Sequence, residues 1–249
     1  MLMTLTLTLA CAADPLAGLT HDDRDAVSML GPHVVQNAID IAPVSVASDW
    51  LPLADSTNTY VRTSGDHAGD TETISLHGAA TPPRGWTMRN PARWTRYLKH
   101  SDSGIHVPTT INVPHAVISH FSPPEPLLIP GAMPGDVIEH TLQVRVYDIH
   151  EPTVLAHSGT LTAHYRDLGG FRVQVPAGTF DTRLIKITYQ GKVGPATITD
   201  SSWAFYAQGV GPVAFVNYKD VSAFLIYNKD ERFGAVLKAS KPSAAPTAP

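Results

Sequence analysis

The sequence predicts a mainly β protein, in which an antiparallel sheet is curled into a barrel, half-barrel or sandwich and a short helix lies near the N-terminus. Segments in which apolar and polar residues alternate recur at regular intervals from residue 49 onward, as expected for strands with one buried face. The 21 prolines and 18 glycines are spread along all 249 residues, where they interrupt helices and suit the turns between strands. Successive strands with almost no helix between them favour antiparallel pairing.

The composition is that of a folded chain without a basic surface. Hydrophobic residues make up 43% of the chain and charged residues 16%, compared with about 25% charged residues in an average domain. A chain of this length buries roughly three quarters of its unfolded surface, so it needs no disulfide or metal to fold. The net charge of −4 argues against nucleic acid as the main partner, because binding phosphates requires basic side chains. No apolar run approaches the ~20 residues of a membrane-spanning helix.

The N-terminus resembles an export signal. The first ten residues, MLMTLTLTLA, look like the apolar core of a signal peptide, and small residues stand at Ala10, Ala12 and Ala13. The alternation of leucine and threonine also fits a first strand, but the small residues and the polar stretch that follows favour export. We therefore assign residues 1–13 to a signal peptide or lipoprotein signal, and expect the protein in the periplasm or anchored to the outer membrane.

Cys11 is the only cysteine of the chain. Residues 8–11 read Thr-Leu-Ala-Cys and resemble a lipoprotein box, although Thr8 and Leu9 depart from the preferred residues. Acylation of Cys11 would explain a lone thiol in an oxidising compartment and would anchor the chain to a membrane. Ordinary cleavage after Ala12 or Ala13 would instead remove the cysteine, and the motif leaves both outcomes open.

Residues 14–48 form an N-terminal segment with one expected helix. The helix candidate is Asp22–Leu30, where aspartates at 22, 23 and 25 suit a helix N-terminus. Gly31 and Pro32 would end it.

Residues 49–237 are predicted to form a single β domain. The clearest alternation lies in Ile138–Asp148, where residues 138, 140, 142, 144 and 146 share one apolar face. The proline-rich stretch Pro123–Pro126 is expected to break the pattern, and residues 238–249, which lack large apolar side chains, are expected to be a disordered tail. The other expected strands are 58–64, 71–78, 104–113, 153–165, 170–175, 182–190, 196–206, 211–218, 223–227 and 232–237.

Two motifs in the second half resemble a known group of proteins. Residues 173–180 read V-Q-V-P-A-G-T-F, and residues 203–211 read W-A-F-Y-A-Q-G-V-G. A V-P-A-G-T-F turn followed by W-x-x-Y-A-x-G-V-G is similar to a family of uncharacterised bacterial periplasmic proteins and lipoproteins, related to accessory lipoproteins encoded near type IV pilus genes. The resemblance implies a β-rich periplasmic or lipid-anchored domain and implies no reaction.

The same motifs have a structural explanation. Pro176 and Gly178 suit a turn between two strands, because proline fixes φ and glycine tolerates unusual backbone angles. Gly209 and Gly211 suit a second tight turn. The aromatic residues of the second motif, Trp203, Phe205 and Tyr206, are expected to pack rather than to form a binding platform.

Neither a metal site nor a catalytic site is predicted. The chain has 12 histidines, but they show no His-Glu-x-x-His spacing and no cysteine pair accompanies them. His140, on an apolar strand face, is expected to be a hydrogen-bonded core residue. There is no Gly-x-Ser-x-Gly elbow and no phosphate-binding glycine loop, so no catalytic residue and no cofactor is assigned.

Residues 84–100 form a basic-aromatic stretch, which combines arginines, a lysine, tryptophans and a tyrosine without any acid. Its functional interpretation is contact with an anionic headgroup or an acidic sugar, with arginine holding phosphate or carboxylate. The alternative, which we favour, is solvated arginines lying over packed tryptophans. The candidate ligand-binding residues are Arg84, Trp86, Arg89, Arg93, Trp94 and Arg96.

These observations favour a non-catalytic cell-envelope protein, either a structural accessory or a binder of a lipid, a glycan or an envelope protein. An apolar pocket inside the sheet would support ligand binding, and a tightly filled core would favour a scaffold. The alternative is an exported hydrolase acting on glycan or peptide, which requires a cleft with paired carboxylates, such as Asp136 and Glu139, or with a nucleophile and its base. A metal carrier would require three converging imidazoles.

Overall fold

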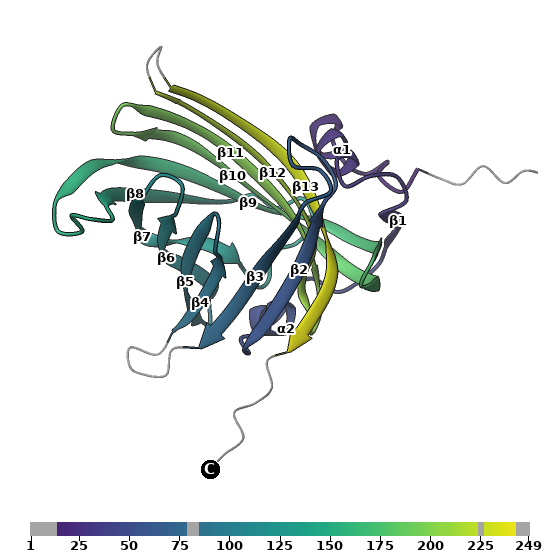
Figure 1. Ribbon diagram of the computed structural model, residues 1–249. Helices are drawn as coiled ribbons and strands as arrows, with labels where there is room; N and C mark the ends of the chain where they lie inside the picture. The colour runs from purple at the N-terminus through teal and green to yellow at the C-terminus, as the bar shows by residue number, and fades with distance from the viewer. Residues whose placement is uncertain (1–13, 79–84, 224–226, 243–249) are drawn as a thin grey trace, which may run out of the picture.

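The computed structural model describes residues 14–78, 85–223 and 227–242, and within these ranges it contains thirteen strands and two helices. Figure 1 shows the arrangement of these elements. In chain order they are α1 His21–Ser28, β1 Val35–Ile39, α2 Ala47–Trp50, β2 Ser56–Arg62, β3 Thr71–Gly78, β4 Trp86–Asn90, β5 Trp94–Ser101, β6 Gly104–Asn112, β7 Val117–Leu128, β8 Ile138–Asp148, β9 Leu155–Val175, β10 Gly178–Val193, β11 Ala196–Ala207, β12 Gly211–Ala223 and β13 Tyr227–Pro242.

The strands form a closed antiparallel barrel. Strands β2 to β13 pair in the order β9-β10-β11-β12-β13-β2-β3-β4-β5-β6-β7-β8, and the pairing of β8 with β9 closes the ring. The long strand β9 pairs with β8 through its first half and with β1 through residues 170–173, so β1 extends the same edge beyond β8. The predicted fold class, a curled antiparallel sheet with a short N-terminal helix, is confirmed.

Alternation of side chains determines which residues face the interior. In β8 the even-numbered residues 138 to 146 are buried or half-buried. This face of the strand points into the barrel, as predicted. Leu142 and Val144 belong to a core cluster with Leu161, Ala163 and Val193 from the two following strands. These aliphatic side chains provide the apolar contacts that hold the β8–β9–β10 part of the wall together.

Several elements differ from the prediction. Strands β4 and β5 form in the basic-aromatic stretch, and β1 and α2 form in segments where neither was expected. The proline-rich stretch does not end β7, because pairing with β8 covers only residues 117–122 and the prolines come after it. Proline cannot donate to a ladder, so it is tolerated where no neighbouring strand needs its N–H. The expected strands 153–165 and 170–175 are one strand, β9.

The C-terminal segment is more ordered than expected through its first residues. Strand β13 continues to Pro242 and pairs with β2, with Ala239 opposite Thr59 and Lys241 opposite Thr57. This pairing takes in residues 238–242 of the expected disordered tail because β2 offers them a free edge. Residues 243–249 of that tail, and the expected signal segment 1–13 with Cys11, lie outside the described residues.

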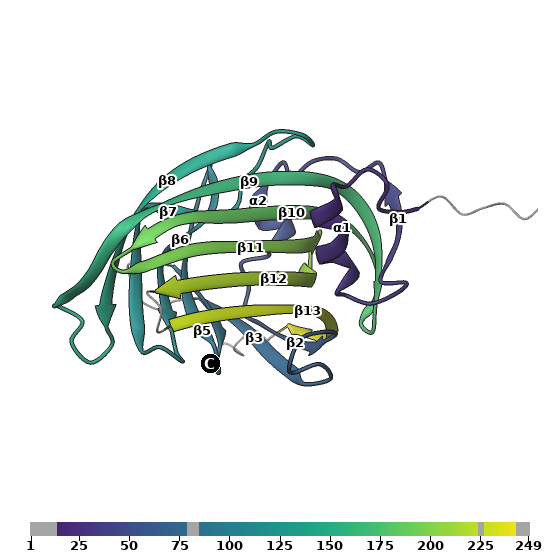
Figure 2. The same cartoon turned by 90° about the horizontal axis from the view of Figure 1, so that it is seen from above.

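Helix α1 covers the outer face of the barrel. Thr20 caps it, with its hydroxyl oxygen accepting from the Asp23 backbone N–H at 3.3 Å, and Gly31 follows the helix with a φ of 100°. In Figure 2 the helix lies across β10 to β12. Its buried residues Ala26, Val27 and Leu30 join a core cluster with Trp203 and Val216 of the wall. The chain before the barrel therefore covers an apolar outer surface that water would otherwise reach.

Helix α2 and its flanking residues close one end of the barrel. Val44, Ala47, Trp50 and Leu51 pack into a core cluster formed by side chains from several barrel strands. Backbone bonds fix the segment, with Gly131 N–H donating to Val44 O at 2.8 Å and Gly209 N–H donating to Asp49 O at 2.7 Å. No helix among the described residues is long and apolar enough to cross a membrane.

The glycine motifs form turns between neighbouring strands. Pro176 and Gly178 lie in the β9–β10 turn, where Gly178 has a φ of 139°. Gly209 and Gly211 lie in the β11–β12 turn, with φ angles of 75° and 96° that side chains disfavour. Trp203 is buried on the outer face beneath α1, and Tyr206 is buried within the cluster that closes the barrel end.

Candidate functional site

The barrel interior contains a cavity of about 500 Å³. It extends to the β2–β3, β4–β5 and β6–β7 turns, which contribute His67, Arg93 and His115 to its wall. Small-molecule sites in proteins commonly have volumes of about 300–1,000 Å³. The cavity is therefore large enough to hold a small ligand, and it distinguishes this barrel from one filled by its own side chains.

The floor of the cavity is apolar. Leu51, next to α2, and Leu127, Ile185 and Tyr206 line it and also belong to the core cluster of the closed end. Further aliphatic side chains continue the lining along the wall, namely Ile74, Met88 and Ile187. An apolar part of a ligand would lose its contact with water here, which is the main source of favourable binding free energy.

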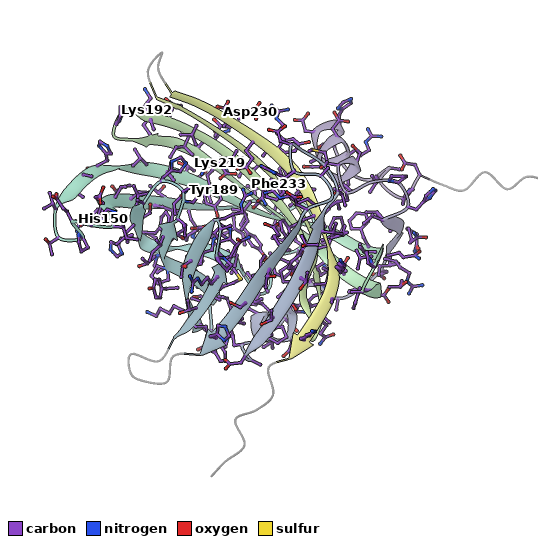
Figure 3. The ribbon with its side chains drawn as sticks, viewed as in Figure 1. His150, Tyr189, Lys192, Lys219, Asp230 and Phe233 are labelled. Atoms are coloured by element: carbon purple, nitrogen blue, oxygen red, sulfur yellow. The ribbon has the colours of Figure 1, made fainter. Side chains whose placement is uncertain are left out.

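The cavity wall beyond the apolar floor is charged. Four basic and four acidic side chains face the cavity, a balance that differs sharply from the apolar floor. The basic residues are Arg62, Arg93, Arg96 and Lys219, and the acidic ones are Asp70, Glu72, Asp200 and Glu231. They come from strands and turns far apart in the sequence, and Figure 3 labels Lys219 on β12 and Phe233 on the neighbouring strand β13.

Two of the arginines are engaged by one carboxylate. Glu231 Oε1 accepts from Arg93 Nη2 at 2.7 Å and lies 3.5 Å from Arg62 Nη2. Both guanidinium groups lie over the ring of Phe233, with centroid distances of 4.0 Å for Arg62 and 4.5 Å for Arg93. The pairing and the cation–π contacts hold these two arginines against the wall.

Asp200 is an ionisable group with a strongly displaced pKa. Burial raises the pKa of this carboxyl to about 6, although Lys219, Arg96 and a hydrogen bond from the Ser201 backbone act in the opposite direction. Glu125 adds to the rise because its charge disfavours a second anion nearby. Lys219 is the cross-strand neighbour of Asp200 on β12. The carboxyl can therefore change its charge in the range of mildly acidic pH.

Two further acids of the interior are hydrogen-bonded. Burial raises the pKa of Glu72 more than the hydrogen bond from Asn90, at 2.8 Å, lowers it, and its Oε1 is buried without a partner among the described residues. Glu125 accepts a hydrogen bond of 2.7 Å from the Tyr189 hydroxyl. Burial and the adjacent Glu125 raise the pKa of Tyr189 well above its ordinary value, so the phenol stays a donor.

Arg96 differs from the other arginines of the cavity. It extends from β5 over the ring of Trp94, with its guanidinium carbon 4.9 Å from the ring centroid. Its Nε is buried and has no hydrogen-bond partner among the described residues. The hydroxyl of Thr110, its cross-strand neighbour on β6, is also buried without a partner in the same part of the chain.

Comparisons with known proteins do not assign the chain to a family. No family model matches the chain, and no curated protein matches it. One similar solved structure is described as a "putative exported protein with YmcC-like fold" from Bacteroides fragilis; it is 16% identical, with a TM-score of 0.43, over 75% of this chain and 94% of that one. Another is described as a "putative lipoprotein" from Parabacteroides distasonis, 14% identical, with a TM-score of 0.40, over 82% of this chain and 100% of that one.

The structure separates the residues of the basic-aromatic stretch. Arg93, Trp94 and Arg96 line the cavity. Trp86 packs against the core cluster of the closed end, while Arg89 is exposed on the opposite face of β4. The sixth candidate, Arg84, lies outside the described residues. Strand alternation explains the position of Arg89, because neighbours in sequence point to opposite sides of a barrel wall.

The candidates for other chemistry lie away from the cavity wall. Asp136 accepts from the Met133 backbone N–H at 3.1 Å in the β7–β8 connection, and Glu139 is exposed with its Oε2 3.3 Å from His164 Nε2. Over residues 14–78, 85–223 and 227–242, no three His, Cys, Asp or Glu side chains are grouped to hold a metal ion. The hydrogen bond expected for His140 is missing at its buried Nε2, for which no described residue is a partner.

Most of the charged wall does not stand out in the sequence. Arg62, Glu72, Asp200 and Lys219 each appear there as one polar residue in a separate strand. A signal was present in the alternation: Arg62 shares its strand face with Tyr60, and Glu72 shares its face with Ile74. A charge on a strand face that is buried marks either a buried pair or a lined cavity.

Proposed function

We propose that the protein is a non-catalytic carrier of the bacterial cell envelope that binds a small amphipathic molecule inside its barrel. The supporting observation is a cavity of about 500 Å³ with an apolar floor beneath a charged wall. A ligand with a hydrocarbon part and a polar head matches this division, because each part would meet groups of its own kind.

A lipid-like ligand fits better than a glycan. The floor is lined by aliphatic side chains such as Leu51, Leu127 and Ile185, which offer a sugar no hydrogen bonds. The envelope location rests on the export signal expected in residues 1–13 and on the possible acylation of Cys11. A carrier held at a membrane surface would have lipids within reach.

Filling the cavity is expected to abolish binding. We expect the wild-type protein to bind the neutral apolar dye N-phenylnaphthylamine with an increase in fluorescence, and Ser202→Trp to weaken this binding at least ten-fold. Ser202 lines the cavity from β11, so an indole at this position would occupy the space that the dye needs. Titration of each variant with the dye, followed by displacement with a monoacylglycerol, measures the effect.

The matched control is Thr199→Trp, on the exposed face of the same strand. It adds the same ring without entering the barrel and should leave the dissociation constant unchanged. Circular dichroism and the unfolding midpoint establish that both variants are folded. Equal binding by the two variants, or no binding by the wild-type protein, would remove the carrier proposal.

A further inference from the structure

We infer that Arg96 is the anchor for an anionic headgroup, a phosphate or a carboxylate, on the molecule that the barrel carries. The inference rests on the proposed function, because it specifies the polar half of the ligand in the same cavity. Arg96 is one of the four basic residues of the wall, and it differs from the other three in its partners.

The other cations of the wall already face acids. Arg93 and Arg62 share Glu231, at 2.7 Å and 3.5 Å, and both stack on Phe233. Lys219 stands opposite Asp200 in the β11–β12 ladder. A ligand that recruited these side chains would have to displace a protein carboxylate, which offsets much of the gain.

Arg96 has no such competitor in contact. Among the described residues, no carboxylate lies within 4.0 Å of its nitrogens and none accepts a hydrogen bond from them. The carboxylates of Asp200 and Glu125 lie further from Arg96 and interact with the charges around it only through space. Glu125 already accepts a hydrogen bond of 2.7 Å from the Tyr189 hydroxyl. Buried polar groups in native proteins are rarely left without a partner, and an absent ion or ligand is a recognised reason when they are.

The surroundings of Arg96 suit an oxyanion. Trp94 supports the guanidinium from one side at 4.9 Å, which leaves its fork of N–H donors free to meet two oxygens of a phosphate or carboxylate. Thr110, opposite Arg96 in the β5–β6 ladder, has an unpartnered hydroxyl that can donate to the same group. The apolar floor then holds the hydrocarbon chain of the same molecule.

The test compares headgroups on one acyl chain. Displacement of N-phenylnaphthylamine by a monoacylglycerol, a fatty acid and a lysophosphatidic acid of equal chain length gives three dissociation constants for each variant. We expect the wild-type protein to bind at least one acidic lipid about ten- to hundred-fold more tightly than the monoacylglycerol, the range of a charge-assisted hydrogen-bonded pair. Arg96→Gln should remove this preference, which is measured within each variant as the ratio of the dissociation constants for the monoacylglycerol and the acidic lipid.

Arg89→Gln is the matched control, because Arg89 extends from the adjacent strand β4 to the outside of the barrel. It should keep the full preference. Arg96→Lys, which keeps the charge but loses the fork, should keep part of it. The acidic lipid that binds more tightly than the monoacylglycerol identifies the headgroup that Arg96 prefers, phosphate or carboxylate. If inorganic phosphate alone displaces the acidic lipid, the natural ligand of Arg96 is a free phosphate ion.

The outcomes separate the two proposals. A preference for acidic lipids that survives in a folded Arg96→Gln protein would overturn the role of Arg96, and so would equal binding of all three lipids by the wild type. In both cases the carrier proposal stands. Failure of the wild-type protein to bind even the monoacylglycerol or the dye would instead remove the carrier function itself.

Discussion

Replacing Asp23 with alanine is expected to lower the free energy of unfolding by about 3–5 kcal/mol, as for a buried charge that loses its partner. Asp23 lies on the buried face of α1 and is 1% exposed. Its Oδ1 accepts from Lys186 Nζ at 2.6 Å and from Trp203 Nε1 at 2.9 Å. Truncation leaves an ammonium and an indole N–H without an acceptor beneath the helix. Urea unfolding at neutral pH measures the change.

The control for this prediction is Asp22→Ala, one residue earlier on the exposed side of the same helix. It loses a charge near the helix N-terminus, which is worth at most about 1 kcal/mol. The pKa of Asp23 is subject to a rise from burial, but hydrogen bonds from Lys186, Thr20 and Trp203 outweigh it and lower the pKa below 3.8. The stabilisation should therefore be complete above pH 3.8 and be lost as the pH falls through the folded pKa. Equal unfolding midpoints for the two variants would show that α1 is not held by this contact.

Local sequence patterns predicted the strands that have one apolar face and clear turns. Ile138–Asp148 and Thr71–Gly78 have the bounds expected from alternation, and the glycines at 209 and 211 mark a turn. Patterns failed where tertiary pairing outweighed local chemistry. Strand β7 runs through Pro123–Pro126 because that part needs no partner on its β8 side, and β13 continues to Pro242 because β2 pairs with it. Both outcomes depend on which strands become neighbours.

The candidate site was visible only in part for a related reason. Arg93, Trp94 and Arg96 stood out because they are close together in the sequence, and they line the cavity. Their counterparts Asp200 and Glu231 lie more than a hundred residues further along the chain and meet them only when the barrel closes. Composition could not reveal this, since a closed barrel brings all its inward faces to one axis whatever their order in the sequence.

Asp200→Asn is expected to stabilise the protein at neutral pH and to leave it unchanged near pH 4. The pKa of Asp200 in the folded state is about 6, compared with an ordinary value of 3.8 for this carboxyl. Between these values the folded state binds the proton more tightly than the unfolded state, so stability falls as the pH rises through this window. This difference between the folded and ordinary pKa corresponds to at most about 3 kcal/mol. Urea unfolding of both proteins at several pH values between 4 and 7.5 measures the difference.

The control is Asp220→Asn, an exposed aspartate on the neighbouring strand β12, which should show no such pH-dependent gain.

The groups that face Asp200 are Lys219, Arg96 and Glu125, so removing its charge also leaves Arg96 with one fewer anion in its neighbourhood. An acidic lipid should consequently bind Asp200→Asn more tightly than wild type at pH 7.5 and equally well below pH 5, where the wild-type carboxyl is protonated. A stability difference that stays constant from pH 4 to 7.5 would mean that water in the cavity already solvates the carboxylate. In that case the charged wall would be a hydrated vestibule, and the attraction of Arg96 for an anion would be correspondingly weaker.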